Sequence, residues 1–309
     1  MSTATHSLPA VASAPAVASA PAFTPSHDYV SEYRERGYTV VRGVFRPEEI
    51  AELRRSFDRA YAEGMTHHST WRHQNRVFWP QQHPTIGRFV SGCQWQSWVD
   101  PVLDRIRTDA RLLAILTPLI GNDLKQITNQ LHWKTPGSGQ TWGMHQDVRS
   151  RKPDHCFREL GSSYVQTAIA IDRHWADNGA MQVIPYSHRR GGMPEATVSN
   201  LANQERLEQY RSQGIDIGAT ADVVMEPGDV ALWGPYMIHG GGINVTTDNF
   251  RRLYINGYVT AANCDRGQPV FDHGKPVPLS IPALIQYEKL YTRPEPHYPD
   301  DKAAHLQRD

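Results

Sequence analysis

Two histidines and one carboxylate have the residue types and spacing to hold a reactive metal ion. His145 and Asp147 are separated by a single residue, and His239 follows much later in the chain. Residues two apart on a strand point to the same side, whereas on a helix they would point about 200° apart, so we expect the pair on a strand or at a strand end. Two imidazoles and one carboxylate leave coordination positions open, which is typical of non-haem Fe(II) oxygenases.

Arginines that follow His239 indicate the co-substrate of such an enzyme. Arg251 and Arg252 lie in a segment that is predicted to be a strand. A guanidinium group binds a carboxylate through two parallel hydrogen bonds, so an arginine here suggests 2-oxoglutarate. Adjacent strand residues face opposite sides, so only one of the two arginines can take this role.

The composition argues against several classes of partner. The 309 residues carry 32 basic and 32 acidic side chains, so no strong field favours nucleic acid or an anionic membrane. The three cysteines form no CxxC pair, which fits a reducing cytoplasm. No stretch approaches the roughly 20 apolar residues of a membrane span. We expect a cytoplasmic protein that binds a small molecule, and the oligomeric state is left open.

The N-terminal third is predicted to be largely helical. Residues 1–25 are rich in Ala, Pro and Ser and lack the features of a secretory signal, so they predict a disordered tail before a single domain of residues 26–309. Ser26 is the predicted N-cap of a first helix that ends at Gly37. Pro47 is expected to open a long second helix.

The elements that follow are predicted from apolar periodicity and turn residues. A strand is expected at residues 38–41, and two further helices at 98–107 and 109–120. Residues 64–84 mix glycine, prolines, histidines and tryptophans, and we expect an irregular surface or lid segment there. The later strands are predicted at 125–134, 164–172, 180–184, 220–225, 229–233 and 252–260. This pattern predicts a mainly β domain with N-terminal helices, built as a sandwich or barrel.

The motifs resemble the phytanoyl-CoA hydroxylase family of Fe(II)/2-oxoglutarate-dependent dioxygenases. No single segment carries the resemblance, but their order and spacing do. The matching segments are residues 37–41, 45–49, 134–137, 144–147, 177–188, 228–230, 239–240 and 244–252.

The resemblance implies a fold and a set of binding residues. The fold is a double-stranded β-helix, which is a jelly-roll with a cupin-like core. The implied iron ligands are His145, Asp147 and His239, with O2 and 2-oxoglutarate as co-substrates. Arg251 is favoured over Arg252 for the distal carboxylate of 2-oxoglutarate, and Gln130 and Gln166 are further candidate contacts.

Two positions within the family pattern bear on the chemistry. The family often has a hydroxyl two residues after the distal histidine, but this chain has Gly241, so one co-substrate contact is missing or supplied elsewhere. Related halogenases lack the carboxylate, so Asp147 argues for hydroxylation or another oxidation of a small molecule, with release of succinate and CO2. No catalytic residue beyond the metal ligands is expected, and His132, His174 and His273 are interpreted as surface or structural residues.

Two clusters are candidates for substrate recognition, because loops near a barrel mouth often carry ligand contacts. The candidate residues are Arg72, Arg76, Trp79, Trp142, Arg149 and Trp233. If the segments 68–79 and 149–155 both face the iron, the substrate is expected to carry a carboxylate or another anionic group. A role in secondary metabolism is favoured by family analogy alone.

Other functions use the same residues. A metal-dependent hydrolase or isomerase on a cupin-like barrel would use the three ligands with another metal and would not need Arg251. A non-catalytic barrel would have no reason to retain the ligands. An oxygenase that acts on protein or nucleic acid would be expected to show a basic tract, and the chain has none.

Overall fold

Two β-sheets face each other in the computed structural model, which describes residues 24–25, 27–193, 208 and 210–279. The larger sheet has ten strands, with the order β1-β10-β7-β12-β5-β4-β3-β2 and with β13 and β14 joined at β5. The smaller sheet has the order β6-β11-β8-β9. The paired strands of the described residues all run antiparallel. The predicted jelly-roll with N-terminal helices is confirmed.

The strands of the large sheet are β1 Tyr38–Val41, β2 Trp71–His73, β3 Arg76–His83, β4 Gly87–Gln94, β5 Leu124–Lys134, β7 Tyr164–Ala170, β10 Val230–Trp233, β12 Arg251–Thr260, β13 Gln268–Asp272 and β14 Lys275–Pro276. Those of the small sheet are β6 Trp142–His145, β8 Met181–Val183, β9 Ala221–Val223 and β11 His239–Gly241. The helices are α1 Tyr29–Arg36, α2 Pro47–Thr66, α3 Pro101–Arg107, α4 Ala110–Ile120 and α5 Leu160–Ser163.

The predicted helices form, with corrected starts. Helix α1 ends at Gly37, whose φ of 84° is the left-handed conformation that glycine adopts without strain. Its N-cap is Asp28, whose carboxylate accepts from the Ser31 amide, so the expected cap at Ser26 was wrong. Helix α3 starts at Pro101 and not at residue 98, because Asp100 accepts from two backbone amides and caps the helix there.

The expectation of an irregular segment at residues 64–84 was wrong. Helix α2 continues to Thr66, and β2 and β3 form a hairpin that extends the large sheet through β4. Val77 and Phe78 are fully buried, so the segment gains its order from packing that local patterns do not reveal. Pro80 lies at a register shift between β3 and β4, where a missing amide disrupts pairing least.

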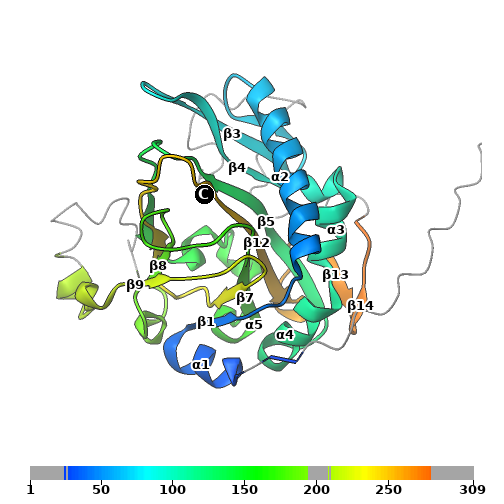
Figure 1. Ribbon diagram of the computed structural model, residues 1–309. Coiled ribbons are helices and arrows are strands. Elements are labelled where there is room, and N and C mark those ends of the chain that lie inside the picture. The colour runs from blue at the N-terminus through cyan, green and yellow to red at the C-terminus, as the bar shows by residue number, and fades with distance from the viewer. Residues whose placement is uncertain (1–23, 26, 194–207, 209, 280–309) are drawn as a thin grey trace, which may run out of the picture.

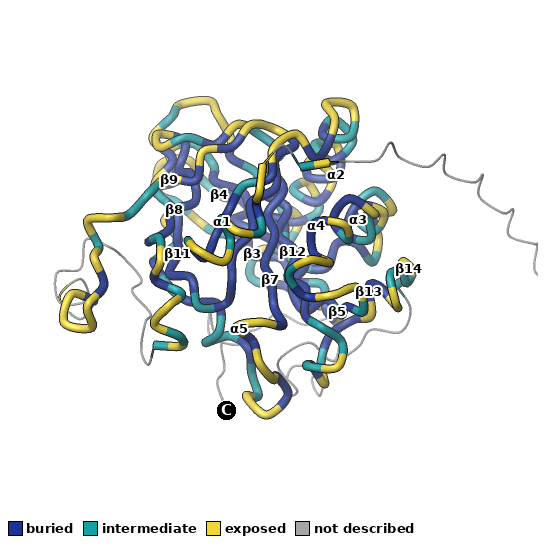
Figure 2. The backbone as a smooth tube through the Cα atoms, turned by 90° about the horizontal axis from the view of Figure 1, so that it is seen from below, coloured by how far each residue is buried: buried dark blue, intermediate teal, exposed yellow. Residues whose placement is uncertain are grey.

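The large sheet buries both of its faces. Helices α2, α3 and α4 lie on one side and strands β8 and β9 on the other (Figure 1). Residues of β12 alternate accordingly: Tyr254 packs with the helices and donates to the Leu103 carbonyl, whereas Leu253 and Ile255 pack toward the small sheet. Figure 2 shows β7 and β12 running through the buried interior. The site described below lies between the two sheets.

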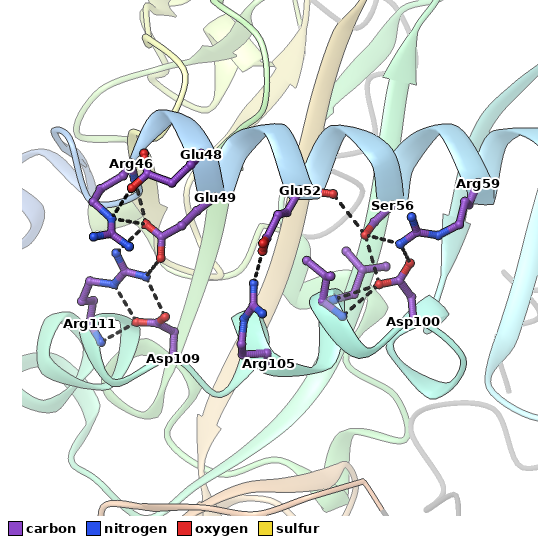
Figure 3. Close-up of polar contacts among 12 residues, drawn as sticks. Arg46, Glu48, Glu49, Glu52, Ser56, Arg59, Asp100, Arg105, Asp109 and Arg111 are labelled. Atoms are coloured by element: carbon purple, nitrogen blue, oxygen red, sulfur yellow. Dashed lines mark hydrogen bonds and ion pairs between the residues drawn. The ribbon is translucent and has the colours of Figure 1, made fainter. Parts of the chain in front are cut away.

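Ion pairs join α2 to the chain around α3 and α4 (Figure 3). Glu49 receives two hydrogen bonds from Arg111, at 2.9 and 2.7 Å, and Arg111 also contacts Asp109. Farther along α2, Arg59 and Ser56 both contact Asp100, the N-cap of α3. These contacts hold the helical layer on the outer face of the large sheet.

The tail of residues 1–25 lies almost wholly outside the described residues, so the division into a tail and a domain of residues 26–309 stays a prediction. Within the described part of the chain, no helix combines the length and apolarity that a membrane crossing requires.

Candidate metal centre and co-substrate site

The three predicted ligands come together between the sheets. His145 ends β6, Asp147 begins the following 3-10 turn, and His239 begins β11 directly opposite His145. The Nε2 atoms of His145 and His239 lie 3.9 and 3.8 Å from the two carboxylate oxygens of Asp147. One ligand atom from each residue lies within 4.8 Å of the others. The strand-end placement expected from the spacing is therefore present.

The surrounding groups orient the ligand atoms. The Nδ1 atoms of His145 and His239 lie 2.7 and 3.1 Å from the carbonyls of Gly143 and Met237, which leaves both Nε2 atoms toward Asp147. A neutral imidazole that donates through Nδ1 has its lone pair on Nε2, as a metal ligand requires. Trp233 donates its Nε1–H to Asp147 Oδ2 at 2.9 Å. Two imidazoles that direct Nε2 toward the same carboxylate, and a carboxylate held by a hydrogen bond, fit a divalent iron ion.

The electrostatics favour the protonation states that bind metal. Burial, together with the charge of His239, lowers the pKa of His145, so its imidazole is neutral. Burial opposes ionisation of Asp147, but the charges of His239, Arg151 and His145 and the Trp233 hydrogen bond lower its pKa below the usual value. A neutral His145 and an ionised Asp147 can ligate a metal without first losing protons.

A cavity of about 970 Å³ opens onto the triad. Most of the residues singled out in the sequence line it. They are His145, Asp147, His239, Arg251, Gln130, Gln166, Arg72, Trp79, Trp142, Arg149 and Trp233. Both candidate recognition segments therefore face the same space as the metal ligands.

The two adjacent arginines have different surroundings. Arg251 is 2% exposed, lines the cavity, and donates from Nε to the Gly179 carbonyl at 3.1 Å. Arg252 faces the other side of the sheet and donates to both oxygens of Asp172 and to Asp58. The structure thus leaves Arg251 available to a ligand of the cavity and commits Arg252 to ion pairs.

Arg76 is the one predicted substrate residue that does not line the cavity. It donates to both carboxylate oxygens of Glu63, at 2.6 and 2.7 Å, and to Gln96. Arg76 and Trp79 are three residues apart on β3. Because side chains alternate along a strand, the two face opposite sides of the hairpin. The expectation of a substrate contact at Arg76 is withdrawn.

Two further residues of this region, His132 and Lys134, were not identified from the sequence as site residues, and Arg151 was included only as part of the segment 149–155. His132 lines the cavity, stacks on Trp142 with ring centroids 4.6 Å apart, and contacts Gln130. His132 is two residues after Gln130 on a strand, so both side chains point to the same face. This spacing was the signal in the sequence that could have identified His132. Arg151 Nη2 lies 3.9 Å from Oδ1 of Asp147, which is four residues earlier in the chain. Lys134 on β5 pairs with Arg251 on β12, and this pairing does not follow from local sequence.

Comparisons with known proteins identify the family. A family model for phytanoyl-CoA dioxygenase (PhyH) matches residues 33–253. The chain is 23% identical over 267 residues to ectoine dioxygenase from Sphingopyxis alaskensis. This match covers 82% of this chain and 83% of that protein. It is 27% identical over 169 residues to dioxygenase lolE1 from Epichloe uncinata, and this match spans only 57% of that relative's length.

Solved structures agree on the fold. The crystal structure of EctD from S. alaskensis with 2-oxoglutarate and 5-hydroxyectoine has a TM-score of 0.59 at 19% identity, covering 81% of this chain and 84% of that one. The epimerase SnoN from nogalamycin biosynthesis has a TM-score of 0.56 at 18% identity, with coverages of 84% and 95%.

The chain therefore belongs to the phytanoyl-CoA dioxygenase family. The resemblance inferred from the motifs is confirmed, and so is the expected enzyme class, a dioxygenase that uses Fe(II) and 2-oxoglutarate. The alternative of a metal-dependent hydrolase or isomerase loses its support.

Proposed function

We propose that this dioxygenase oxidises an anionic small molecule, one that carries a carboxylate or a similar group. The observation that carries the proposal is the charge of the cavity. The charged side chains among its described lining residues, with histidines neutral, are Arg72, Arg149, Arg151, Arg251 and Asp147. Four guanidinium groups and one carboxylate leave an excess of three positive charges.

The cofactors do not remove this excess. Fe(II) brings two positive charges and 2-oxoglutarate brings two negative charges, so together they leave the charge of the cavity unchanged. The net positive charge of the cavity attracts an anionic substrate during its approach. An anionic group on the bound substrate also balances that charge.

Each group of residues has a role in this proposal. His145, Asp147 and His239 would hold iron, and Arg251 would bind the distal carboxylate of 2-oxoglutarate. Bound iron supplies the activation of O2 for substrate oxidation, with succinate and CO2 as products. Gln130 and Gln166 offer amide groups to bound carboxylates. Trp79 and Trp142 form aromatic walls that shield the reacting groups from water.

The aromatic and charged lining suits a substrate larger than a simple metabolite. A volume of about 970 Å³ is at the upper end of ordinary ligand pockets, so the co-substrate leaves ample room for it. The fold shared with SnoN, an enzyme from nogalamycin biosynthesis, supports a role in secondary metabolism. Hydroxylation as the outcome and a cytoplasmic location stay predictions.

The test is a screen for succinate release with acids and their methyl esters as matched pairs. We expect turnover of an acid and little turnover of its ester, and a raised KM for that acid in Arg149→Gln. Arg158→Gln is the matched control, because Arg158 is exposed, pairs with Asp265 and lies outside the cavity lining. Equal turnover of acids and esters would overturn the substrate class. Absence of 2-oxoglutarate binding would overturn the enzyme assignment.

A further inference from the structure

Arg151 is a buried cation that lies beside a metal ligand. It is 4% exposed, lines the cavity and follows Asp147 by four residues. Its Nη2 atom lies 3.9 Å from Asp147 Oδ1, which is too long for a hydrogen bond between the two groups. The 3-10 turn between them maintains this separation, since the Arg151 amide donates to the Val148 carbonyl and the Val148 amide donates to the Pro235 carbonyl. A positive charge is therefore held next to the metal centre.

Tyr164 on β7 supports the Arg151 guanidinium. The guanidinium carbon lies 4.7 Å from the centre of the Tyr164 ring, and Nη2 donates to the Tyr164 hydroxyl. The same hydroxyl donates to Gln166 Oε1. Gly257 on the neighbouring strand β12 leaves room for it, because a Cβ atom at that position would lie 2.4 Å from the hydroxyl oxygen. The fold thus sets the position of the Arg151 charge.

Arg72 lines the same cavity but belongs to a distant strand. It lies on β2 at the edge of the large sheet, whereas Trp233, which donates to Asp147, lies on β10. Six steps between neighbouring strands separate β10 from β2, at about 4.8 Å a step along the sheet. An anionic group bound at Arg72 would therefore lie far from the metal ligands, and one bound at Arg151 would lie beside them.

We propose that Arg151 binds the anionic group of the substrate, so that the enzyme oxidises a carbon close to that group. A guanidinium has five N–H groups in a planar fork, so it can contact Tyr164 and a carboxylate together. A charge-assisted hydrogen bond is about 2.8 Å long, which places the anionic group within about 7 Å of the Asp147 carboxylate. An extended chain advances about 3.5 Å in three bonds, so this distance spans at most about six bonds. The inference rests on the proposed anionic substrate and adds where on it the oxidation occurs.

The role of Arg151 in the reaction is selection of the C–H bond. Written as a hydroxylation, the reaction converts a C–H bond of the substrate to C–OH, and 2-oxoglutarate is oxidised to succinate and CO2. One oxygen atom of O2 enters the new hydroxyl and the other enters succinate. O2 takes up four electrons, two from 2-oxoglutarate and two from the C–H bond. Arg151 exchanges no electrons or protons in this balance and holds the substrate in place.

The first test is the position of the new C–O bond. The iron-loaded protein is supplied with 2-oxoglutarate and with an acid that releases succinate in the screen above, and NMR of the product locates the oxidised carbon. In the wild type we expect it no more than about six bonds from the carboxyl carbon. Arg151→Gln should give products oxidised at several positions, and Arg72→Gln should leave the position unchanged. Oxidation at a more distant carbon in the wild type would overturn the inference.

Anaerobic binding of the same acid to the loaded protein, measured by calorimetry, tests the anchor directly. Arg151→Gln removes the charge but keeps a polar side chain, and it should raise the Kd of the acid about 10–100-fold, as loss of a hydrogen bond to a charged group does. Arg151→Lys keeps the charge and should recover part of this affinity. The control of the screen, Arg158→Gln, should bind the acid as the wild type does.

The Kd for Fe(II), measured by competition with a chelator, separates anchoring from a structural role. If Arg151 served only to hold Asp147, Arg151→Gln would raise the Kd for Fe(II) and leave that of the acid unchanged, and this result would overturn the inference. An unchanged Kd for both in the folded variant would do the same. If Arg151→Gln does not fold, the position of oxidation in the wild type still decides. A wild type that turns over acids and esters equally would instead overturn the proposed function.

Discussion

Removal of the Trp233 indole N–H should weaken iron binding without dismantling the site. Trp233 donates to Asp147 Oδ2 at 2.9 Å, and the exposures of the two residues are 2% and 9%. Trp233→Phe keeps an aromatic ring in the core but leaves one carboxylate oxygen without this donor. The loss disfavours the ionised form of Asp147, which is the form that binds metal.

The expected magnitude follows from two independent estimates. A hydrogen bond to a charged group contributes about 1.5–3 kcal/mol. Loss of a group that orients a metal ligand typically lowers metal affinity about 10–100-fold, which at about 1.4 kcal/mol per tenfold is the same range. We therefore expect the Kd for Fe(II) to rise about 10–100-fold in Trp233→Phe.

The assay is anaerobic competition for Fe(II) against a coloured chelator, with thermal melting as the measure of folding. Trp133→Phe is the matched control. Trp133 is as buried as Trp233, but it packs against Phe57 and Tyr61 on the helical side of the large sheet. Both variants should lose some stability, and only Trp233→Phe should lose metal affinity. A folded Trp233→Phe whose Kd stays within about twofold of the wild type would refute the reasoning.

Two further predictions concern the arginines of β12 and an ion pair of the helical layer. Arg251→Lys should raise the KM for 2-oxoglutarate at least about tenfold, because an ammonium cannot reproduce a bidentate contact. Arg252→Gln should instead lower the melting temperature, since Asp172 loses its two side-chain hydrogen bonds from the Arg252 guanidinium and keeps the 3.6 Å ion pair with Arg54. The opposite pattern would reverse the assignment of the two arginines. Burial opposes ionisation of Glu49, but hydrogen bonds from Arg111 lower its pKa to about 2 from 4.5. This pair therefore stabilises the fold above pH 4.5 and loses that effect as the pH falls toward about 2. In Glu49→Gln, the free energy of unfolding measured with denaturant should fall less steeply over this pH range than in the wild type. An unchanged pH dependence would contradict the prediction.

The sequence by itself was enough to predict the candidate ligands, the family and most of the elements. His145 and Asp147 could share an ion only at a strand or its end, because side chains alternate with period two, and β6 ends at His145. The helix opened by Pro47 formed for equally local reasons, namely a proline in the first turn, acidic neighbours and an apolar stripe.

Tertiary structure decided whatever depended on which strands pair. Val77 and Phe78 lie in a hairpin that local composition predicted to be irregular, because its order comes from pairing with β4. The alternation rule required Arg251 and Arg252 to face opposite sides, but only the packed sheets show which side holds the cavity. The pairing of Lys134 with Arg251 is likewise a matter of register between distant segments, which residue spacing along the chain does not encode.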